Sequence, residues 1–237
     1  MNKIIKYKWI HFVFLSLFSV VLTSCAIGLP RHWPEKTGRV LDVHTKKPVK
    51  DAYLIVKWKG YGGWVGIRTI CYHVESSKTN ENGQFVIPEF NENFTDGSLS
   101  SRHASIYLYA PNYIESEYRR SNHHYKQKTY FLEEFKGTRK KRLDFLSSGV
   151  ACRNAGSSKK KLLAANIAMY KEAKSLYEKN KSLVPKTKEE KKIFFFMKLR
   201  LASLIDDSHR KYTGIKKEKK IEEILKNYDQ ELLELSE

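Results

Sequence analysis

The chain has 237 residues, of which 41% are hydrophobic, enough for one medium domain or two small ones with real cores. It carries 44 lysines and arginines against 26 acidic residues, a formal net charge of +18. The basic excess runs through both halves of the chain, whereas a specific nucleic-acid binder more often concentrates it on one motif. A basic excess spread in this way is consistent with loose attraction to anionic lipid, cell-wall polymer or glycan. A generally lysine-rich composition, which acts mainly on solubility, explains the excess equally well.

The first 25 residues have the three parts of an export signal. A basic start with Lys3, Lys6 and Lys8 precedes an apolar run over about residues 10–22, and small residues lead from this run to Cys25. A membrane-spanning helix needs about 20 apolar residues, so the run is short for one. The alternative is an uncleaved N-terminal anchor.

The end of this signal, Leu-Thr-Ser-Cys25, resembles the lipobox of bacterial lipoproteins, with Thr23 as a tolerated variant. The resemblance implies that residues 1–24 are a lipoprotein signal peptide and that the Cys25 thiol carries diacylglycerol. Several acyl chains, at roughly 0.8 kcal/mol per buried CH₂, make a stable anchor. Ala26 is not the Asp that retains such proteins at the inner membrane, which implies the outer membrane of a bacterial cell envelope. Residues 25–35 would then be a lipid-anchored tether.

Residues 36–146 consist of short apolar runs separated by turn residues, the pattern of an all-β sandwich. Leu54, Val56 and Trp58 form a period-two face, which is typical of a half-buried strand. Asn82-Gly83 offers the positive φ angles that a tight turn needs before the next strand. The seven expected strands are residues 38–43, 52–58, 64–74, 84–88, 104–110, 113–118 and 142–146. The segments 89–103 and 118–141 are expected to be long polar loops.

The stretches Thr79–Pro88 and Ala110-Pro-Asn-Tyr113 carry a family likeness. Together with the strands expected at 38–43 and 52–58, they resemble the carboxypeptidase regulatory-like domain, a transthyretin-like β-sandwich. The resemblance covers residues 36–146 and implies a non-catalytic module that accompanies enzymes or transporters. Asn112 replaces the glycine that is common in the second stretch, and asparagine also accepts a left-handed φ.

Beyond residues 147–153 glycine and proline become rare, and leucine, alanine, lysine and glutamate dominate. Ser157 or Ser158 can cap a first helix that ends near Pro185, and further helices should span about 187–210 and 216–235. The apolar run Ile193–Met197 places the second helix at the centre, or else on a surface that contacts a partner or membrane. The expected fold class is α+β: a seven-stranded transthyretin-like, immunoglobulin-like β-sandwich over 36–146, followed by a helical domain of about three α-helices over 157–237.

Three aromatic residues, Trp58, Tyr61 and Trp64, surround a glycine-rich turn and form the candidate binding loop. They could stack on sugar rings or on a partner's aromatic face. The alternative is a hairpin whose two tryptophans fold onto the sandwich, because aromatic side chains mostly fill cores and interfaces.

Two pairs of residues are candidate metal ligands. His32 and Glu35 have the His-x-x-Glu spacing of metallocarboxypeptidases, and His123 and His124 are adjacent. Neither pair has a third ligand nearby, and a zinc site needs three or four. We therefore expect no metal and no other cofactor.

Cys71 and Cys152 remain once Cys25 is acylated. Export to an oxidising compartment makes a disulfide the default for an isolated pair, and this bond would tie the helical segment to the sandwich. The alternative is two buried free thiols.

The sequence contains no Gly-x-Ser-x-Gly elbow, no phosphate-binding glycine loop and no Cys-x-x-Cys motif, so we expect no enzyme. The leading hypothesis is a lipid-anchored envelope protein whose β-sandwich binds a protein or glycan partner, with no specific nucleic acid. One alternative is a structural subunit of an envelope secretion or transport assembly. The other is loose polyanion binding at the membrane.

Overall fold

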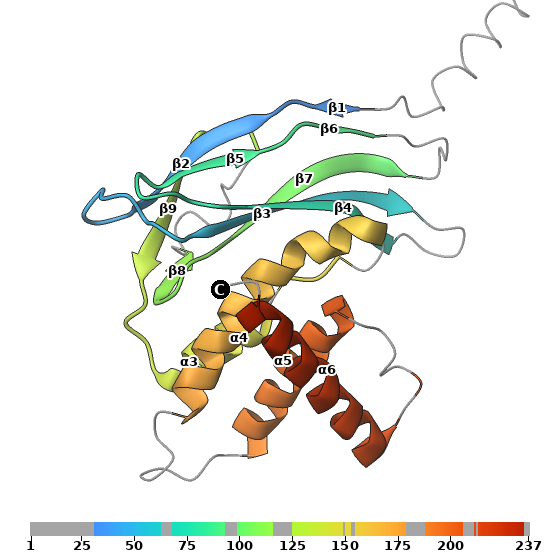
Figure 1. Ribbon diagram of the computed structural model, residues 1–237. Helices are drawn as coiled ribbons and strands as arrows, with labels where there is room; N and C mark the ends of the chain where they lie inside the picture. Colours follow the sequence, from blue (N-terminus) through green and yellow to red (C-terminus); the bar gives the residue numbers. More distant parts are fainter. Residues whose placement is uncertain are drawn as a thin grey trace, which may run out of the picture.

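The computed structural model describes residues 31–62, 68–92, 99–115, 125–148, 150–152, 155–178, 188–205, 211 and 213–234. Strands occupy the first part of these ranges and helices the second, which confirms the α+β class. The strands form stacked sheets, and the helices pack on one side of them (Figure 1). None of the helices in these ranges is long and apolar enough to cross a membrane.

The described residues form nine strands, not the expected seven. They are β1 (His32–Trp33), β2 (Lys36–Asp42), β3 (Tyr53–Gly62), β4 (Arg68–Lys78), β5 (Gln84–Ile87), β6 (Phe90–Asn91), β7 (Ser100–Tyr109), β8 (Tyr113–Glu115) and β9 (Thr129–Glu134). These strands make a four-stranded sheet in the order β5-β2-β9-β8, a three-stranded sheet in the order β4-β3-β7, and the short pair β1-β6. The pairing of β2 with β9 is parallel, whereas the other pairings are antiparallel.

The four-stranded and three-stranded sheets share an apolar core. Leu54, Val56 and Trp58 of β3 are fully buried in it, on the period-two face that the sequence predicts. The four-stranded sheet contributes Val40, Phe85, Ile87, Tyr130 and Leu132. Burying an aliphatic or aromatic side chain of this size stabilises a fold by about 1.5 to 3 kcal/mol, so this core is a major source of stability.

Two of the positions predicted to have a left-handed backbone, Gly83 and Asn112, do so, whereas Asn82 does not. Gly83, between β4 and β5, has a φ of 68°, and a Cβ atom there would lie 2.5 Å from the carbonyl oxygen of Val40. Asn112, between β7 and β8, has a φ of 63°. Glycine and asparagine therefore occupy positions that most side chains would strain.

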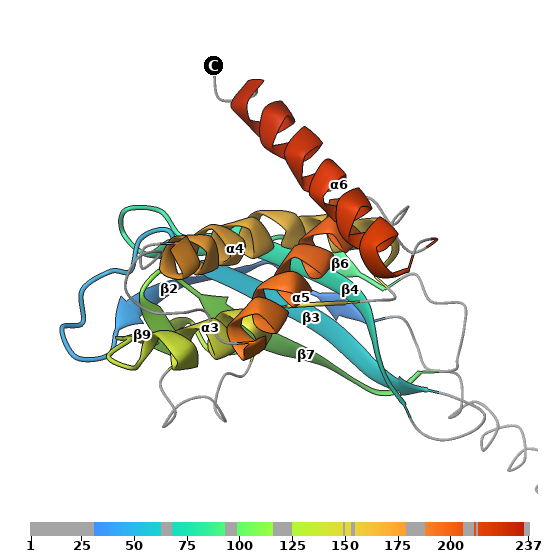
Figure 2. The ribbon, with the colours of Figure 1, turned by 90° about the horizontal axis from the view of Figure 1, so that it is seen from below.

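Helices follow β9 and cover the outer face of the three-stranded sheet (Figures 1 and 2). They are α3 (Arg139–Ser148), the 3-10 helix η1 (Gly156–Leu162), α4 (Leu163–Glu178), α5 (Lys188–Ile205) and α6 (Gly214–Glu234). Ile55, Val74 and Tyr109 of the sheet form one core with Leu146 of α3 and Met169 of α4. The sheet thus buries apolar side chains on both faces, one toward the other sheet and one toward the helices.

Helix α5 is the central helix, as predicted. Its Met197 and Leu204 join the core beneath the sheet, whereas Leu201 and Ala202 pack against Ile221 of α6. Helix α6 crosses α5 and projects away from the sheets (Figure 2). The apolar stripe of α5 is therefore divided between two cores.

The strand expected at 142–146 is wrong, because these residues belong to α3. Leu143 and Phe145 alternate as in a strand, but the buried side chains are Arg142, Leu143 and Leu146, which is the spacing of one helix face. A strand that the sequence reading missed, β9, lies inside the segment expected to be a loop. Its Tyr130 is fully buried.

The start of the first long helix also differs from expectation. The chain turns through η1 before α4 begins at Leu163, and Ser158 does not cap a helix. Its hydroxyl donates to the carbonyl oxygen of Ala155 at 2.7 Å and accepts the amide of Val74 in β4 at 3.3 Å. Ser158 therefore joins the helical segment to the sheet edge.

A buried ion pair fastens the helices to the β7–β8 turn. The Arg142 guanidinium, with a 2% exposed side chain, donates from Nε and Nη2 to the two Glu172 oxygens at 2.7 and 2.8 Å. It also donates to the carbonyl oxygens of Ala110 and Tyr113. Tyr109 donates its hydroxyl to Glu172 at 2.9 Å. One pair thus links α3, α4 and the turn.

Candidate functional site

The residues of the expected binding loop do not share one environment. Trp58 is fully buried in the core between the sheets, so it follows the alternative in which it folds onto the sandwich. Tyr61, three residues further along β3, is 38% exposed, and its ring lies 6.0 Å from that of His103. Trp64 lies outside the described residues. Of this loop, the structure therefore offers Tyr61 as an accessible aromatic side chain.

Trp58 forms the centre of an aromatic cluster at this end of the sandwich. Its ring centroid lies 5.3 Å from Phe90, 5.2 Å from His73, and 6.1 Å from both Trp33 and Tyr125. The rings of His73 and Phe90 stack in parallel at 3.7 Å. Aromatic pairs at such distances contribute about 0.5 to 1.5 kcal/mol each beyond their buried area. The cluster therefore holds the β1–β6 pair rigidly on the three-stranded sheet.

A buried carboxylate, Glu92, sits at the edge of the aromatic cluster. One of its oxygens accepts hydrogen bonds from Trp33 Nε1 at 2.8 Å and from the Tyr72 hydroxyl at 2.5 Å. The other accepts from the Arg102 guanidinium at 2.6 Å. A carboxylate without solvent exposure is costly unless it is paired and hydrogen-bonded, and here three donors meet that requirement.

The surroundings of Tyr72 keep its hydroxyl protonated, so that it can donate a hydrogen bond to Glu92. Burial, and then the hydrogen bond to Glu92, raise the pKa of its hydroxyl well above the ordinary value. Tyr72 therefore keeps its proton and remains bonded to the carboxylate at physiological pH. The geometry gives this cluster a structural role: it holds β1 and the end of β6 against β4 and β7.

Sequence reasoning did not identify the Glu92 cluster. Tyr72, Glu92 and Arg102 come from β4, the segment after β6, and β7, and no local spacing connects them. Glu92 also lies in a segment whose polar composition favoured a loop. The burial of a glutamate in such a segment can be recognised only in the folded structure, where its hydrogen-bond donors come together.

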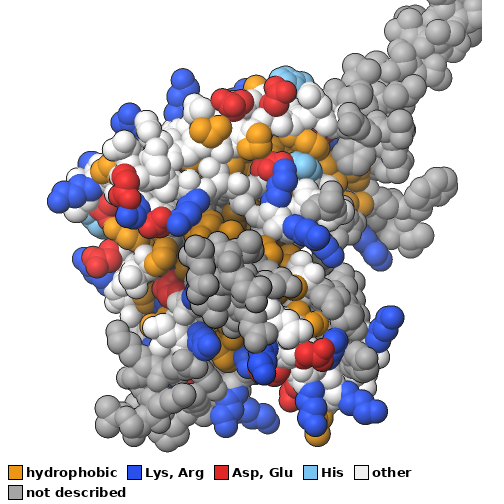
Figure 3. Space-filling view, in the orientation of Figure 1, with side chains coloured by type: hydrophobic (Ala, Val, Ile, Leu, Met, Phe, Trp, Pro, Cys, Tyr) orange, Lys and Arg blue, Asp and Glu red, His pale blue; other side chains and the backbone are white. Residues whose placement is uncertain are grey.

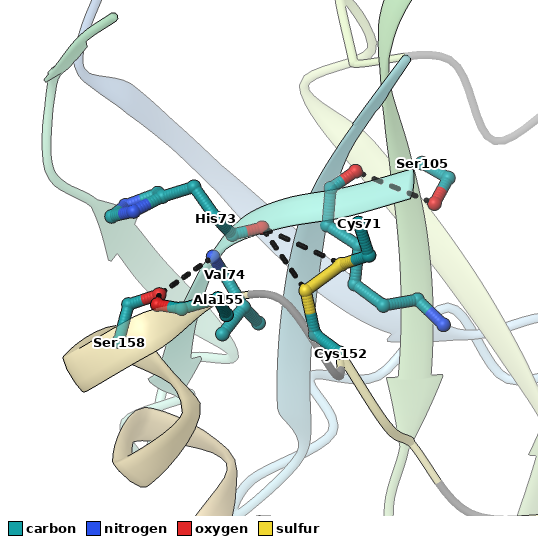
Figure 4. Close-up of a disulfide and its surroundings, with 8 residues drawn as sticks. Cys71, His73, Val74, Ser105, Cys152, Ala155 and Ser158 are labelled. Carbon is teal, nitrogen blue, oxygen red and sulfur yellow. Dashed lines mark hydrogen bonds between the residues drawn. A yellow bond between two sulfur atoms is a disulfide. The ribbon is translucent and has the colours of Figure 1, made fainter. Parts of the chain in front are cut away.

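Cys71 and Cys152 form a disulfide, as predicted (Figure 4). Their Cα atoms are 5.2 Å apart, within the range that a disulfide spans. The sulfur atoms of Cys71 and Cys152 lie 3.8 and 3.7 Å from the carbonyl oxygen of His73. These are van der Waals contacts and not hydrogen bonds, because a disulfide has no S–H proton to donate. The bond joins β4 to the chain between α3 and η1, so it ties the helices to the sheet.

Other predicted site residues lie outside the described ranges. These are Cys25, His123 and His124. Within the described ranges, no three histidine, cysteine or acidic side chains are grouped so that they could hold a metal ion. His32 instead bonds Asn91 across the β1–β6 pair at 2.7 Å.

The basic side chains are spread over the molecule. On the face shown in Figure 3, lysines and arginines lie over both the sheets and the helices, with acidic and apolar side chains between them. This distribution matches the excess in both halves of the sequence.

Comparisons with known proteins give no assignment. No family model and no curated protein matches the chain. Among solved structures, a 9R-lipoxygenase from Cyanothece PCC8801 is 17% identical to it, with 63% of this chain and 25% of that chain covered and a TM-score of 0.19. The chain spans a quarter of that protein's length, and a likeness this weak carries no argument.

Proposed function

We propose that this protein is a lipid-anchored component of a bacterial cell envelope, whose non-catalytic β-sandwich binds a protein or glycan partner. The N-terminal export signal and the Leu-Thr-Ser-Cys25 end support the anchor. By its resemblance, the sandwich would be a transthyretin-like, carboxypeptidase regulatory-like module. The facing sheets and the left-handed turns at Gly83 and Asn112 are compatible with that assignment.

The observation that carries the proposal is how soon the fold begins after Cys25. The carbonyl oxygen of Arg31 accepts the Glu92 amide at 3.0 Å, and its guanidinium donates to the Arg102 carbonyl oxygen at 2.7 Å. Trp33 is bonded to Glu92 and packed on Trp58. Five residues, 26–30, separate Cys25 from Arg31, and the six residue-to-residue steps of a fully extended chain span no more than about 22 Å. An acylated Cys25 would therefore hold the sandwich close to the lipid surface.

The end of the sandwich nearest this anchor is also the end where β3 finishes and β4 begins. The β3 end and the β4 start lie at the same end of the molecule as β1 (Figure 1). Tyr61 is exposed there on strands that a buried core holds in place. An exposed aromatic on a rigid support costs little conformational entropy to bind, which suits stacking on a sugar ring or an aromatic side chain.

The test is photocrosslinking in intact cells. A photoreactive phenylalanine analogue in place of Tyr61 should capture one dominant protein or glycan in the envelope. The same analogue in place of Val86, which is 51% exposed on β5, is the matched control and should capture it at least tenfold less. A spread of polymers at both positions would instead favour loose polyanion binding, and equal capture at both positions would contradict the proposed surface.

The anchor is tested in the same experiment. Cys25→Ser removes the thiol that accepts the lipid, so this variant should leave the membrane fraction after an alkaline wash and lose the Tyr61 crosslink. If the variant stays in the membrane fraction, the anchor is not the Cys25 lipid.

A further inference from the structure

A groove of about 790 Å³ lies beside the disulfide, between α5 and the segment that follows α3. Its walls include Cys152 of the disulfide and four apolar side chains of α5: Ile193, Phe196, Leu199 and Leu204. Phe196 is 47% exposed, which is unusual for a phenylalanine on a helix that is otherwise packed on both sides. The volume is within the range of small-molecule sites, about 300 to 1,000 Å³.

Arg200 lines the same groove, and its charge has no carboxylate partner. Its guanidinium donates from Nη2 to the Ser147 carbonyl oxygen at 2.6 Å, at the end of α3. This bond uses one of five donors, and no acidic side chain in the described ranges forms an ion pair with Arg200. Arg200 is half-buried, and this burial lowers the pKa of its guanidinium.

Two lysines add to the positive charge on this side of the sheet. Lys59 is directly opposite Cys71 across the β3–β4 pairing, and Lys57 is on the same face by the two-residue period of a strand. Burial lowers the pKa of Lys57 to about 8, with a further contribution from Lys59. Within the described ranges neither lysine forms a salt bridge, but the Glu115 carboxylate acts on Lys57 from a longer distance and partly offsets the lowering of its pKa. Lys159 also lines the groove.

Partly buried charges of one sign are unfavourable unless an opposite charge is bound near them. Here the Arg200 guanidinium, which has no acidic partner among the described residues, lines a groove whose α5 wall is apolar. A ligand that relieves both features has an anionic group for Arg200 and a hydrocarbon chain for the α5 wall.

We propose that this groove binds a single-chain anionic amphiphile, a long-chain fatty acid, with its carboxylate at Arg200 and its hydrocarbon chain along Ile193, Phe196 and Leu199. The proposal does not rest on the envelope location or on the partner proposed for the sandwich. A phospholipid with two chains would need more apolar wall than the groove supplies.

The test is photolabelling of the full-length protein in phosphatidylcholine nanodiscs. A diazirine derivative of palmitic acid should label peptides from α5 saturably. The matching derivative of hexadecanol has the same chain but no charge, and it should need at least about a tenfold higher concentration, because a hydrogen bond to a charged group is lost. Arg200→Gln should cause a similar loss for the acid, whereas Arg200→Lys should retain most of the labelling.

Three surface variants keep the test independent of folding: one changes the groove, and two are controls. Phe196→Glu places a negative charge at the groove and should abolish labelling of α5 by the acid. Ile215→Glu, at a 72% exposed position on α6, and Lys191→Gln, at an exposed position on α5, should leave labelling unchanged. Equal labelling by acid and alcohol, or labelling that does not saturate, would overturn the proposal. Labelling of α5 by an anionic phospholipid but not by the acid would overturn the single-chain assignment.

Discussion

Replacing both Cys71 and Cys152 with alanine should lower the free energy of unfolding by roughly 4 to 5 kcal/mol in the chain-entropy account. The disulfide spans a sequence separation of 81 residues. Opening so long a loop raises the conformational entropy of the unfolded chain and so favours unfolding. Ser158 and the Lys161–Glu75 ion pair also join β4 to the helical segment, so the double variant should still fold. Urea denaturation, followed by far-ultraviolet circular dichroism, measures the change.

The reduced wild-type protein is the control for this prediction. It keeps both sulfur atoms in the core, so it separates the effect of the crosslink from that of lost packing. Its unfolding midpoint should fall nearly as far as that of the double variant. An unchanged midpoint on reduction would show that the crosslink adds little to stability.

Replacing Arg142 with methionine should lower the free energy of unfolding by about 3 to 5 kcal/mol, because Glu172 would be left buried without its counter-charge. The side chains of Arg142 and Glu172 are only 2% and 12% exposed. Two backbone carbonyl oxygens, those of Ala110 and Tyr113, would also lose a donor. Chemical denaturation of the purified variant measures the loss.

Lys140→Met provides the matched comparison, because Lys140 also forms an ion pair from α3, with Glu189, but both side chains are more than half exposed. An exposed pair contributes little to stability, because water and salt screen its charges. If Arg142→Met costs no more than Lys140→Met, the Arg142–Glu172 pair does not fasten the helices. Adding Glu172→Met to Arg142→Met should recover part of the lost stability, since it removes the stranded carboxylate.

The elements that sequence predicted best are those with an uninterrupted period. The alternation of Leu54, Val56 and Trp58 identified β3 and its buried face, and the apolar stripe of α5 identified a central helix. These patterns are local consequences of burying one face, so they need no knowledge of the partner element.

The missed strand and the misread helix have a shared cause. Strand β9 pairs in parallel with β2, roughly ninety residues earlier. Its antiparallel partner β8 is separated from it by residues 116–128, so no short hairpin turn marks β9 in the sequence. In α3 the buried face includes Arg142, whose burial depends on Glu172 in another helix. An arginine counts as polar in any local pattern, so the helix face could not be seen. The Glu92 cluster was hidden for the same reason, because its donors are distant in sequence.

The disulfide was predictable from the number of cysteines and the export signal. With Cys25 assigned to the lipid, only one pair of cysteines remained, and the structure brings that pair together. For the aromatic loop the sequence allowed two interpretations, a binding surface or a hairpin packed on the core. The burial of Trp58 shows that this residue belongs to the core.

The mass of the intact protein, extracted without reductant from the membranes of the cells that produce it, tests the central claim most directly. The account predicts a chain that begins at Cys25, carries acyl chains on that residue, and is two hydrogens lighter than the fully reduced form because Cys71 and Cys152 are bonded. A chain that begins at Met1, or that starts at Cys25 without added lipid, would contradict the anchor on which the proposed function depends.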